Sequence, residues 1–79
     1  MRMDYITFRS ITPAQRGERL LQREGILCTL TRTPRHLAQQ GCGYSLRLRP
    51  ADTHKAIRTL EENHIPYSKI YTPPEDQPL

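Results

Sequence analysis

The chain has 79 residues, with 12 lysines and arginines against 8 aspartates and glutamates, so its formal net charge at pH 7 is +4. A chain of this length forms one small domain that buries roughly 60% of the surface exposed in its unfolded form. No apolar run approaches the roughly 20 residues that cross a bilayer, and the N-terminus lacks the apolar segment of a signal peptide. We therefore expect a cytoplasmic protein with no membrane partner, in which the two cysteines stay reduced.

The excess of basic residues fits several kinds of partner. A positive surface attracts nucleic acid, anionic small molecules or acidic proteins, and it also occurs simply as a solvated surface. The positions of the arginines in the fold indicate the kind of partner better than their number does.

The first part of the chain predicts a strand followed by a helix. Residues 4–9 alternate between apolar and polar side chains, which is the pattern of a half-buried strand. Thr12 is a suitable N-cap and Pro13 suits the first helical position, so we expect a helix over residues 13–24. Gly25 is expected to end it.

The middle of the chain predicts two strands joined by a connector. Residues 26–32 alternate again, residues 33–40 contain a proline and basic residues without a regular pattern, and residues 43–49 form a third alternating stretch. We expect Pro50 to end this third strand.

The last part predicts a helix, a strand and a tail. Asp52 is a plausible N-cap for a helix over residues 53–63. A strand over residues 65–71 follows, and Pro66 near its start indicates an edge position. The polar, proline-rich residues 73–79 are expected to be disordered.

This order of elements, β-α-β-β-α-β, is typical of the ferredoxin-like fold. We predict an α+β sandwich in which residues 1–72 form one domain, with a four-stranded antiparallel sheet and both helices on one face. The strands at 4–9 and 43–49 are expected in the centre, and those at 26–32 and 65–71 at the edges. The strand at 4–9 is expected to separate the strands at 26–32 and 43–49.

Cys42 lies between Gly41 and Gly43 at the start of the third strand. In the predicted topology this position shares one end of the domain with the N-terminus of the first helix and with Arg32 and Arg35. Helix N-termini and nearby cations lower the pKa of a cysteine thiol and so favour its reactive thiolate. Cys42 is therefore a candidate nucleophilic or group-carrying thiol. The alternative is that the glycines serve a tight turn and Cys42 fills a small gap.

Cys28 has the opposite pattern. It lies in mid-strand between Ile26 and Leu30 on the apolar alternation, which predicts a core residue. With a strand between them, Cys28 and Cys42 would be about 9–10 Å apart, beyond disulfide reach. The chain also shows no metal-type spacing of its histidines and no glycine-rich phosphate loop, so we expect neither metal nor cofactor.

Four segments, YITFRSITPAQRGERLL, GILCTLTRTPR, GCGYSLRLR and IPYSKIY, resemble a small bacterial family known as selenium/sulfur carrier protein-like. The shared features are Ser10 and Thr12 before the first helix, a Thr-Pro-Arg connector at Thr33, and the Cys42-Gly43 pair. The resemblance implies a protein linked to selenium metabolism that holds sulfur or selenium on a cysteine. The matching position makes Cys42 the carrier residue.

A carrier of this kind would be loaded by a donor protein and unloaded by an acceptor protein, without turnover catalysis of its own. We expect the anionic cargo to be stabilised by the N-terminus of the first helix and by residues around it. The candidate binding residues are Gly41, Gly43, Arg35, Thr12, Ser10, Arg32 and Pro34.

Two other functions are left open. The same topology occurs in RNA-recognition modules, but these stack bases on aromatic residues of the open sheet face, whereas Phe8 and Tyr44 fall on the inner alternation. Nucleic acid is therefore disfavoured as a partner. The other alternative is a small anion-binding or regulatory module in which Cys42 has no role. Such a module could form a homodimer through its open sheet face.

Overall fold

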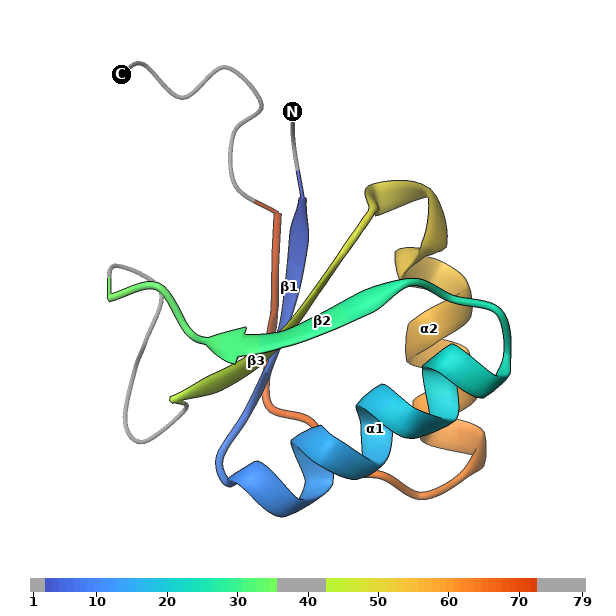
Figure 1. The fold of residues 1–79 in the computed structure, drawn as a ribbon, viewed down its shortest axis with the longest axis horizontal. Helices are drawn as coiled ribbons and strands as arrows, with labels where there is room; N and C mark the ends of the chain where they lie inside the picture. Colours follow the sequence, from blue (N-terminus) through green and yellow to red (C-terminus); the bar gives the residue numbers. More distant parts are fainter. Residues whose placement is uncertain (1–2, 36–42, 73–79) are drawn as a thin grey trace.

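The computed structural model describes residues 3–35 and 43–72, so the expectation for the tail at 73–79 lies outside the described residues. The two helices and the four-stranded antiparallel sheet confirm the predicted α+β class, and Figure 1 shows both helices packed on the same face of the sheet. In chain order the elements are β1 (Asp4–Phe8), α1 (Ile11–Arg23), β2 (Cys28–Arg32), β3 (Tyr44–Leu48), α2 (Pro50–Glu62) and β4 (Ile70–Tyr71).

The sheet has the strand order β2-β3-β1-β4. The prediction that β1 and β3 are central and that β2 and β4 are edge strands is confirmed. The prediction that β1 separates β2 from β3 is wrong, because β2 and β3 pair directly and antiparallel. Consecutive strands that no helix separates in the chain usually pair, whereas the α1 crossover leaves a gap between β1 and β2 that β3 fills.

This correction removes the strand-spacing argument against a disulfide between the two cysteines. The register replaces it, because Cys28 lies opposite Leu48 while Arg32 lies opposite Tyr44. Cys28 is therefore at the end of the β2–β3 pair that is remote from Gly43, about 17 Å away along the strands.

Both helices begin earlier than the sequence predicted. The N-cap of α1 is Ser10, not Thr12, and the N-cap of α2 is Arg49, not Asp52. The reason is that a proline fits anywhere in the first helical turn, where its missing N–H leaves no hydrogen bond unmade. Pro50 therefore ends β3 and also starts α2.

The end of α1 depends on Gly25. Its φ of 84° lies in the left-handed region that favours glycine. The Gly25 N–H donates to the Gln22 carbonyl at 3.1 Å, and the Ile26 N–H donates to the Leu21 carbonyl at 2.9 Å. These two hydrogen bonds form a Schellman motif, so the predicted role of Gly25 is confirmed.

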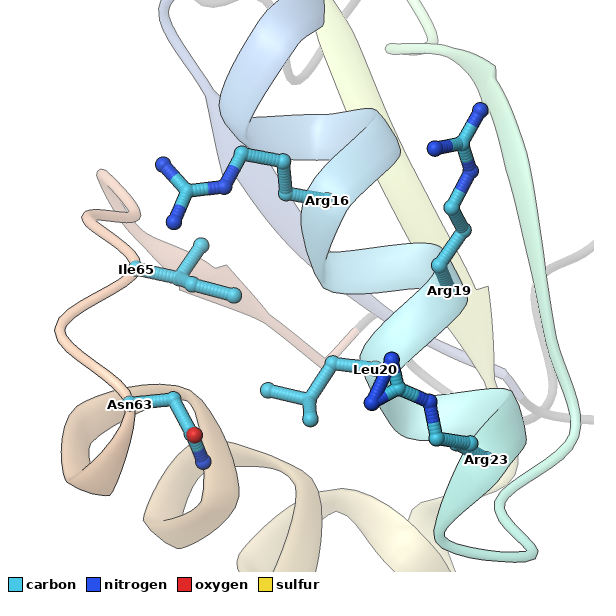
Figure 2. A pocket seen from close by; sticks show the side chains of 6 residues that line it. All are labelled: Arg16, Arg19, Leu20, Arg23, Asn63 and Ile65. Atoms are coloured by element: carbon cyan, nitrogen blue, oxygen red, sulfur yellow. The ribbon is translucent and has the colours of Figure 1, made fainter.

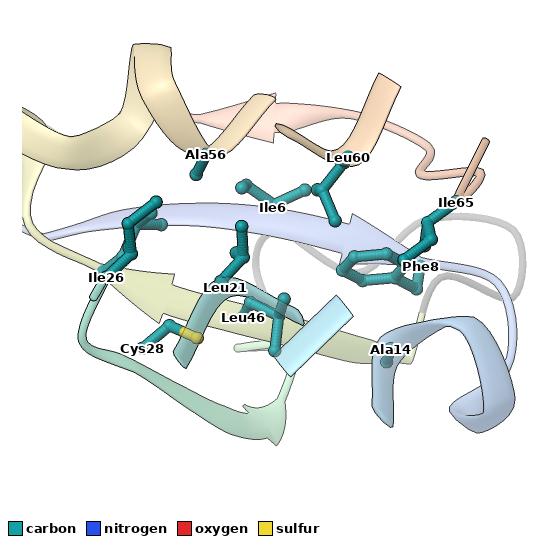
Figure 3. Close-up of a cluster of buried hydrophobic side chains, with 11 residues drawn as sticks. Ile6, Phe8, Ala14, Leu21, Ile26, Cys28, Leu46, Ala56, Leu60 and Ile65 are labelled. Carbon is teal, nitrogen blue, oxygen red and sulfur yellow. The ribbon is translucent and has the colours of Figure 1, made fainter. Parts of the chain in front are cut away.

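The core lies between the sheet and the two helices (Figure 3). Helix α1 approaches the core closely at Gly17, where a Cβ atom would lie 3.2 Å from Leu60 Cδ2 and 3.3 Å from Leu46 Cδ1. The alternations and helical stripes read from the sequence supply all of its members except Ile65. The core consists of Ile6, Phe8, Ala14, Leu21, Ile26, Cys28, Leu46, Leu48, Ala56, Leu60 and Ile65.

The last strand is much shorter than predicted. Residues 65–69 are irregular, because Pro66 cannot donate a ladder hydrogen bond and the chain bulges next to Thr7. The Thr7 N–H donates to the Lys69 carbonyl at 2.8 Å, while the Thr7 carbonyl accepts from the Ser68 N–H at 2.7 Å. Two residues therefore face one across the strand pair, which is the pattern of a β-bulge.

The sheet face away from the helices is not uniformly open. Thr7 and Ser45 on this face are fully buried, whereas Thr29 and Arg47 are exposed. Phe8 is in the core and Tyr44 packs against it, so these two aromatic residues are not on the outer face, as predicted. Neither helix within residues 3–35 and 43–72 has the length and apolar character needed to cross a membrane.

Candidate functional site

Cys42 and Gly41 lie outside the described residues, so the candidate site is described from Gly43 onward. The Gly43 carbonyl accepts a hydrogen bond from the Thr33 N–H at 3.0 Å. The hydroxyl groups of Thr33 and Ser45 are 2.5 Å apart, and both side chains are buried. These two contacts join the end of β2 to the start of β3, so the residue that follows Cys42 is firmly held.

The described surroundings of Gly43 are open. A Cβ atom built there would meet no atom of the described residues within 4 Å. The small size of Gly43 leaves free space beside the backbone on the side of the described residues.

The N-terminus of α1 lies at the same end of the sheet as Gly43. The register aligns Phe8, the last residue of β1, with Tyr44 of β3, and Tyr44 with Arg32 of β2. Ser10 follows Phe8 closely and is the N-cap of α1, but its side chain makes no capping hydrogen bond. The first N–H groups of a helix have no partner within the helix and carry partial positive charge, which favours an anion at this end.

The other candidate binding residues differ in how they are held. Arg32 lies over the ring of Tyr44, 5.5 Å from its centroid, in a cation–π contact. Thr12 is exposed in the first turn of α1, Arg35 is exposed in the turn after β2, and Pro34 is partly buried. Among the described residues, neither Arg32 nor Arg35 has a carboxylate within ion-pair distance. Both guanidinium groups are therefore available to an anion at this end of the domain.

A pocket of about 270 Å³ opens beside the N-terminus of α1. The sequence identified Ser10 as a candidate at this end, but it did not identify the contribution of the segment after α2. The sequence predicts a regular strand for that segment, and Pro66 within it is the signal that could have indicated its irregular backbone. The pocket is lined by Arg9, Ser10, Pro13, Pro66, Tyr67 and Ser68.

Tyr67 in this pocket is held by a neighbouring carboxylate. Its hydroxyl donates to Glu61 Oε2 at 2.8 Å. This hydrogen bond is the main cause that raises the pKa of Tyr67 above its usual value, because the bond is lost when the phenol ionises.

Cys28 is a core residue, as the sequence predicted. Its side chain is 8% exposed, and its Sγ lies 3.9 Å from the Glu18 carbonyl oxygen. Burial, and secondly the Glu18 carboxylate, raise the pKa of Cys28 to about 11. A buried, protonated thiol is a poor nucleophile, so Cys28 is unsuited to covalent chemistry.

Helix α1 also covers the outer edge of β2 beside Cys28. The Leu30 N–H donates to Glu18 Oε2 at 3.1 Å, and Gln22 Nε2 donates to the Cys28 carbonyl at 3.3 Å. These side chains occupy backbone groups that an edge strand would otherwise offer to another chain. Addition of a further strand along this part of β2 is therefore blocked.

The described residues define the class of protein: a small α+β domain with one thiol in its core and with basic groups and a helix N-terminus at the end next to Gly43. The chain belongs to the family described as "Putative Se/S carrier protein-like", which it matches over residues 4–72. The resemblance drawn from the sequence is thereby confirmed. The match spans the Cys42-Gly43 pair. No curated protein and no solved structure matches the chain.

Proposed function

We propose that the protein carries a sulfur or selenium atom on Cys42 and passes it to an acceptor protein. Membership of the selenium/sulfur carrier-like family is the observation that carries this proposal. The chain has two cysteines, and the burial and raised pKa of Cys28 support assigning the cargo to Cys42.

The loading step is a thiol exchange that needs no external oxidant or reductant. The Cys42 thiolate attacks the outer sulfur of a persulfide on the donor protein, forming a new S–S bond. The S–S bond of the donor breaks, and its electron pair leaves with the donor thiolate, which takes up a proton. The products are a Cys42 persulfide and a donor thiol. If selenium is the outer atom on the donor, the same exchange gives Cys42–S–SeH and a donor thiol.

Unloading repeats this exchange in the other direction. A nucleophile of the acceptor attacks the outer sulfur or selenium atom, and the Cys42 thiolate is the leaving group. Each atom delivered therefore returns Cys42 to its starting state. The protein shuttles between donor and acceptor without acting as a turnover catalyst.

The anionic states of this cycle need positive partners. We propose that the N-terminus of α1, with Ser10 and Thr12, stabilises the thiolate and the bound persulfide, together with Arg35 and secondarily Arg32. The support is that α1 begins at the same sheet end as Gly43 and that both guanidinium groups lack a carboxylate partner among the described residues. In this proposal Gly41 and Gly43 keep the sulfur accessible and Pro34 shapes the connector.

This cycle also determines the compartment and the partners that the protein needs. Loading requires a free thiol, so we propose the reducing cytoplasm as its location. The partners are a donor protein that carries a persulfide, or the equivalent with selenium as its outer atom, and an acceptor protein.

Intact mass after loading tests the proposal. The protein is incubated with a cysteine desulfurase and cysteine, and Cys42→Ala is compared with Cys28→Val, which keeps the core filled. Wild type and Cys28→Val should each gain the mass of one sulfur atom, and Cys42→Ala should gain none. Equal gain by Cys42→Ala, or no gain by wild type, would contradict the proposal.

One observation favours a second function, an anion-binding module in which Cys42 is incidental. The pocket beside the N-terminus of α1 is lined by Arg9 and by Ser10, the N-cap of the helix, and it has room for an oxyanion. Thermal stabilisation by a panel of oxyanions separates the two functions. Equal stabilisation of wild type and Cys42→Ser, without sulfur loading, would favour the module.

A further inference from the structure

A groove lies between α1 and the C-terminal end of α2, away from the pocket at the N-terminus of α1. Its volume is about 250 Å³. Figure 2 shows the side chains of α1 on one side of it and those that follow α2 on the other. The groove is lined by Arg16, Arg19, Leu20, Arg23, Asn63 and Ile65.

Three of these residues are arginines on a single helix. Arg16, Arg19 and Arg23 are spaced i, i+3 and i+7, so they follow one side of α1 over about 10 Å. All three are exposed, and none has a carboxylate within ion-pair distance in the described parts of the chain. Like charges three and four residues apart destabilise a helix slightly. The negative end of the helix dipole stabilises the charge of Arg23. Arg16 and Arg19 are too far from that end to be stabilised by it.

The floor of the groove is apolar. Ile65 is 5% exposed and Leu20 is partly buried against the core. In Figure 2, Arg16 extends toward Ile65, the guanidinium of Arg23 lies beside Leu20, and Arg19 extends away from both apolar residues. The arginines therefore flank an apolar strip and do not converge on one point.

We propose that this groove docks an acidic amphipathic helix of a partner protein. Carboxylates on that helix would contact the three arginines, and an apolar side chain would lie over Leu20 and Ile65. A helix that carries carboxylates at i, i+3 and i+7 has the same rise between its charges as α1 has between its guanidinium groups. Guanidinium and carboxylate groups pair through two parallel hydrogen bonds.

The observations favour this partner over two others. A single small anion would be held best by converging guanidinium groups, but Arg19 is directed away from Arg16. Single-stranded nucleic acid is bound by stacking on aromatic rings, and within residues 3–35 and 43–72 no aromatic residue lines the groove. The docking proposal does not depend on the cargo of Cys42, so it can fail or hold independently of the carrier function.

The test uses a fluorescent synthetic helical peptide with glutamates at i, i+3 and i+7 and a leucine at i+4 on the same face. Its control is a peptide of the same composition whose glutamates are spread around the helix. The groove variant is Arg16→Glu/Arg19→Glu/Arg23→Glu. The matched control variant, Arg47→Glu/Lys55→Glu/Arg58→Glu, makes the same charge change at three exposed cations outside the groove.

At physiological salt the groove variant should lose about tenfold or more in affinity for the first peptide, the sum of three exposed ion pairs. The control variant should stay within about threefold. If charge reversal unfolds the domain, as judged by circular dichroism, the variant with glutamine at the same three positions is used in its place. It too should lose affinity for the first peptide. Equal losses in both variants, equal binding of both peptides, or tighter arginine-dependent binding of inorganic phosphate or single-stranded RNA would overturn the proposal.

Discussion

The backbone N–H of Thr33 donates to the carbonyl oxygen of Gly43 at 3.0 Å, and this hydrogen bond closes the β2–β3 pair at the residue that follows Cys42. The hydroxyl of Thr33 reinforces it through its contact of 2.5 Å with the hydroxyl of Ser45. Ser45 is fully buried, so this contact lies in a low-dielectric surrounding where a lost hydrogen bond is costly. A small polar cluster thus anchors the strand that presents the candidate thiol.

Thr33→Val should lower the free energy of unfolding by about 1–2 kcal/mol, because it leaves the Ser45 hydroxyl buried without a partner. Urea denaturation measures this loss. The double variant Thr33→Val/Ser45→Ala removes both hydroxyls and should recover part of the stability. If the two substitutions instead cost the sum of their separate effects, the hydroxyl pair is not the source of the loss.

The stability of the protein should fall as the pH rises from about 9 to about 11. The pKa of Cys28 is about 11 in the folded protein and close to its ordinary value in the unfolded chain. In this range the unfolded chain releases the thiol proton while the folded protein retains it, which favours unfolding. Urea denaturation at a series of pH values measures the slope. Tyr67, whose pKa is also raised, contributes in the same direction at the upper end of the range.

Cys28→Val separates the two contributions. This variant should show a shallower fall in stability between about pH 9 and 10 than wild type. The same slope in both proteins would mean that Cys28 is not buried as a neutral thiol.

Glu18→Gln should lower the pKa of Cys28 from about 11 while leaving it above the ordinary value of a cysteine thiol. The substitution removes the carboxylate charge, which is the smaller of the two causes, and leaves burial unchanged. The ultraviolet absorbance of the thiolate measures the pKa in a Cys42→Ser background. Glu24→Gln, which changes an exposed carboxylate at the end of the same helix, is the control and should have no such effect.

Gly17→Val should lower the free energy of unfolding by about 2 kcal/mol, because its branched side chain would force apart α1 and the leucines beneath it. Gly17→Ala should have a smaller effect, since the close contacts of 3.2 and 3.3 Å involve flexible leucine methyl groups and alanine favours a helix. Gly43→Ala serves as a second control, because its added methyl group meets no atom within 4 Å in the part of the chain that the structure describes. Comparable losses for Gly17→Val and Gly43→Ala would contradict the packing argument.

The sequence predicts the core well because burial imposes a simple period. The alternation through Ile6 and Phe8 and the helical spacing of Ala14 and Leu21 each mark the side that is buried. Helix starts are less determined. Ser10 and Thr12 are both suitable caps, and in the structure the cap side chain forms no hydrogen bond that would single it out.

Long-range pairing is harder to predict than local structure. Whether β1 or β3 lies beside β2 depends on how the crossover through α1 is accommodated. The length of β4 depends on a bulge opposite Thr7 that only the folded sheet creates. The basic groove was likewise not predictable, since Arg16 is visible as helix surface but its approach to Ile65 depends on tertiary packing.

The central claim is that Cys42, and not Cys28, is the reactive thiol. The most direct measurement is the rate of alkylation by iodoacetamide as a function of pH in two single-cysteine proteins, Cys28→Val and Cys42→Ser. The protein that retains Cys42 should react with an apparent pKa below about 8.5, the ordinary value for a cysteine. The protein that retains Cys28 should react at least about a hundredfold more slowly at pH 8, since a pKa of about 11 leaves few thiolates at that pH. A Cys42 pKa at or above about 8.5, or equal rates in the two proteins, would contradict the account.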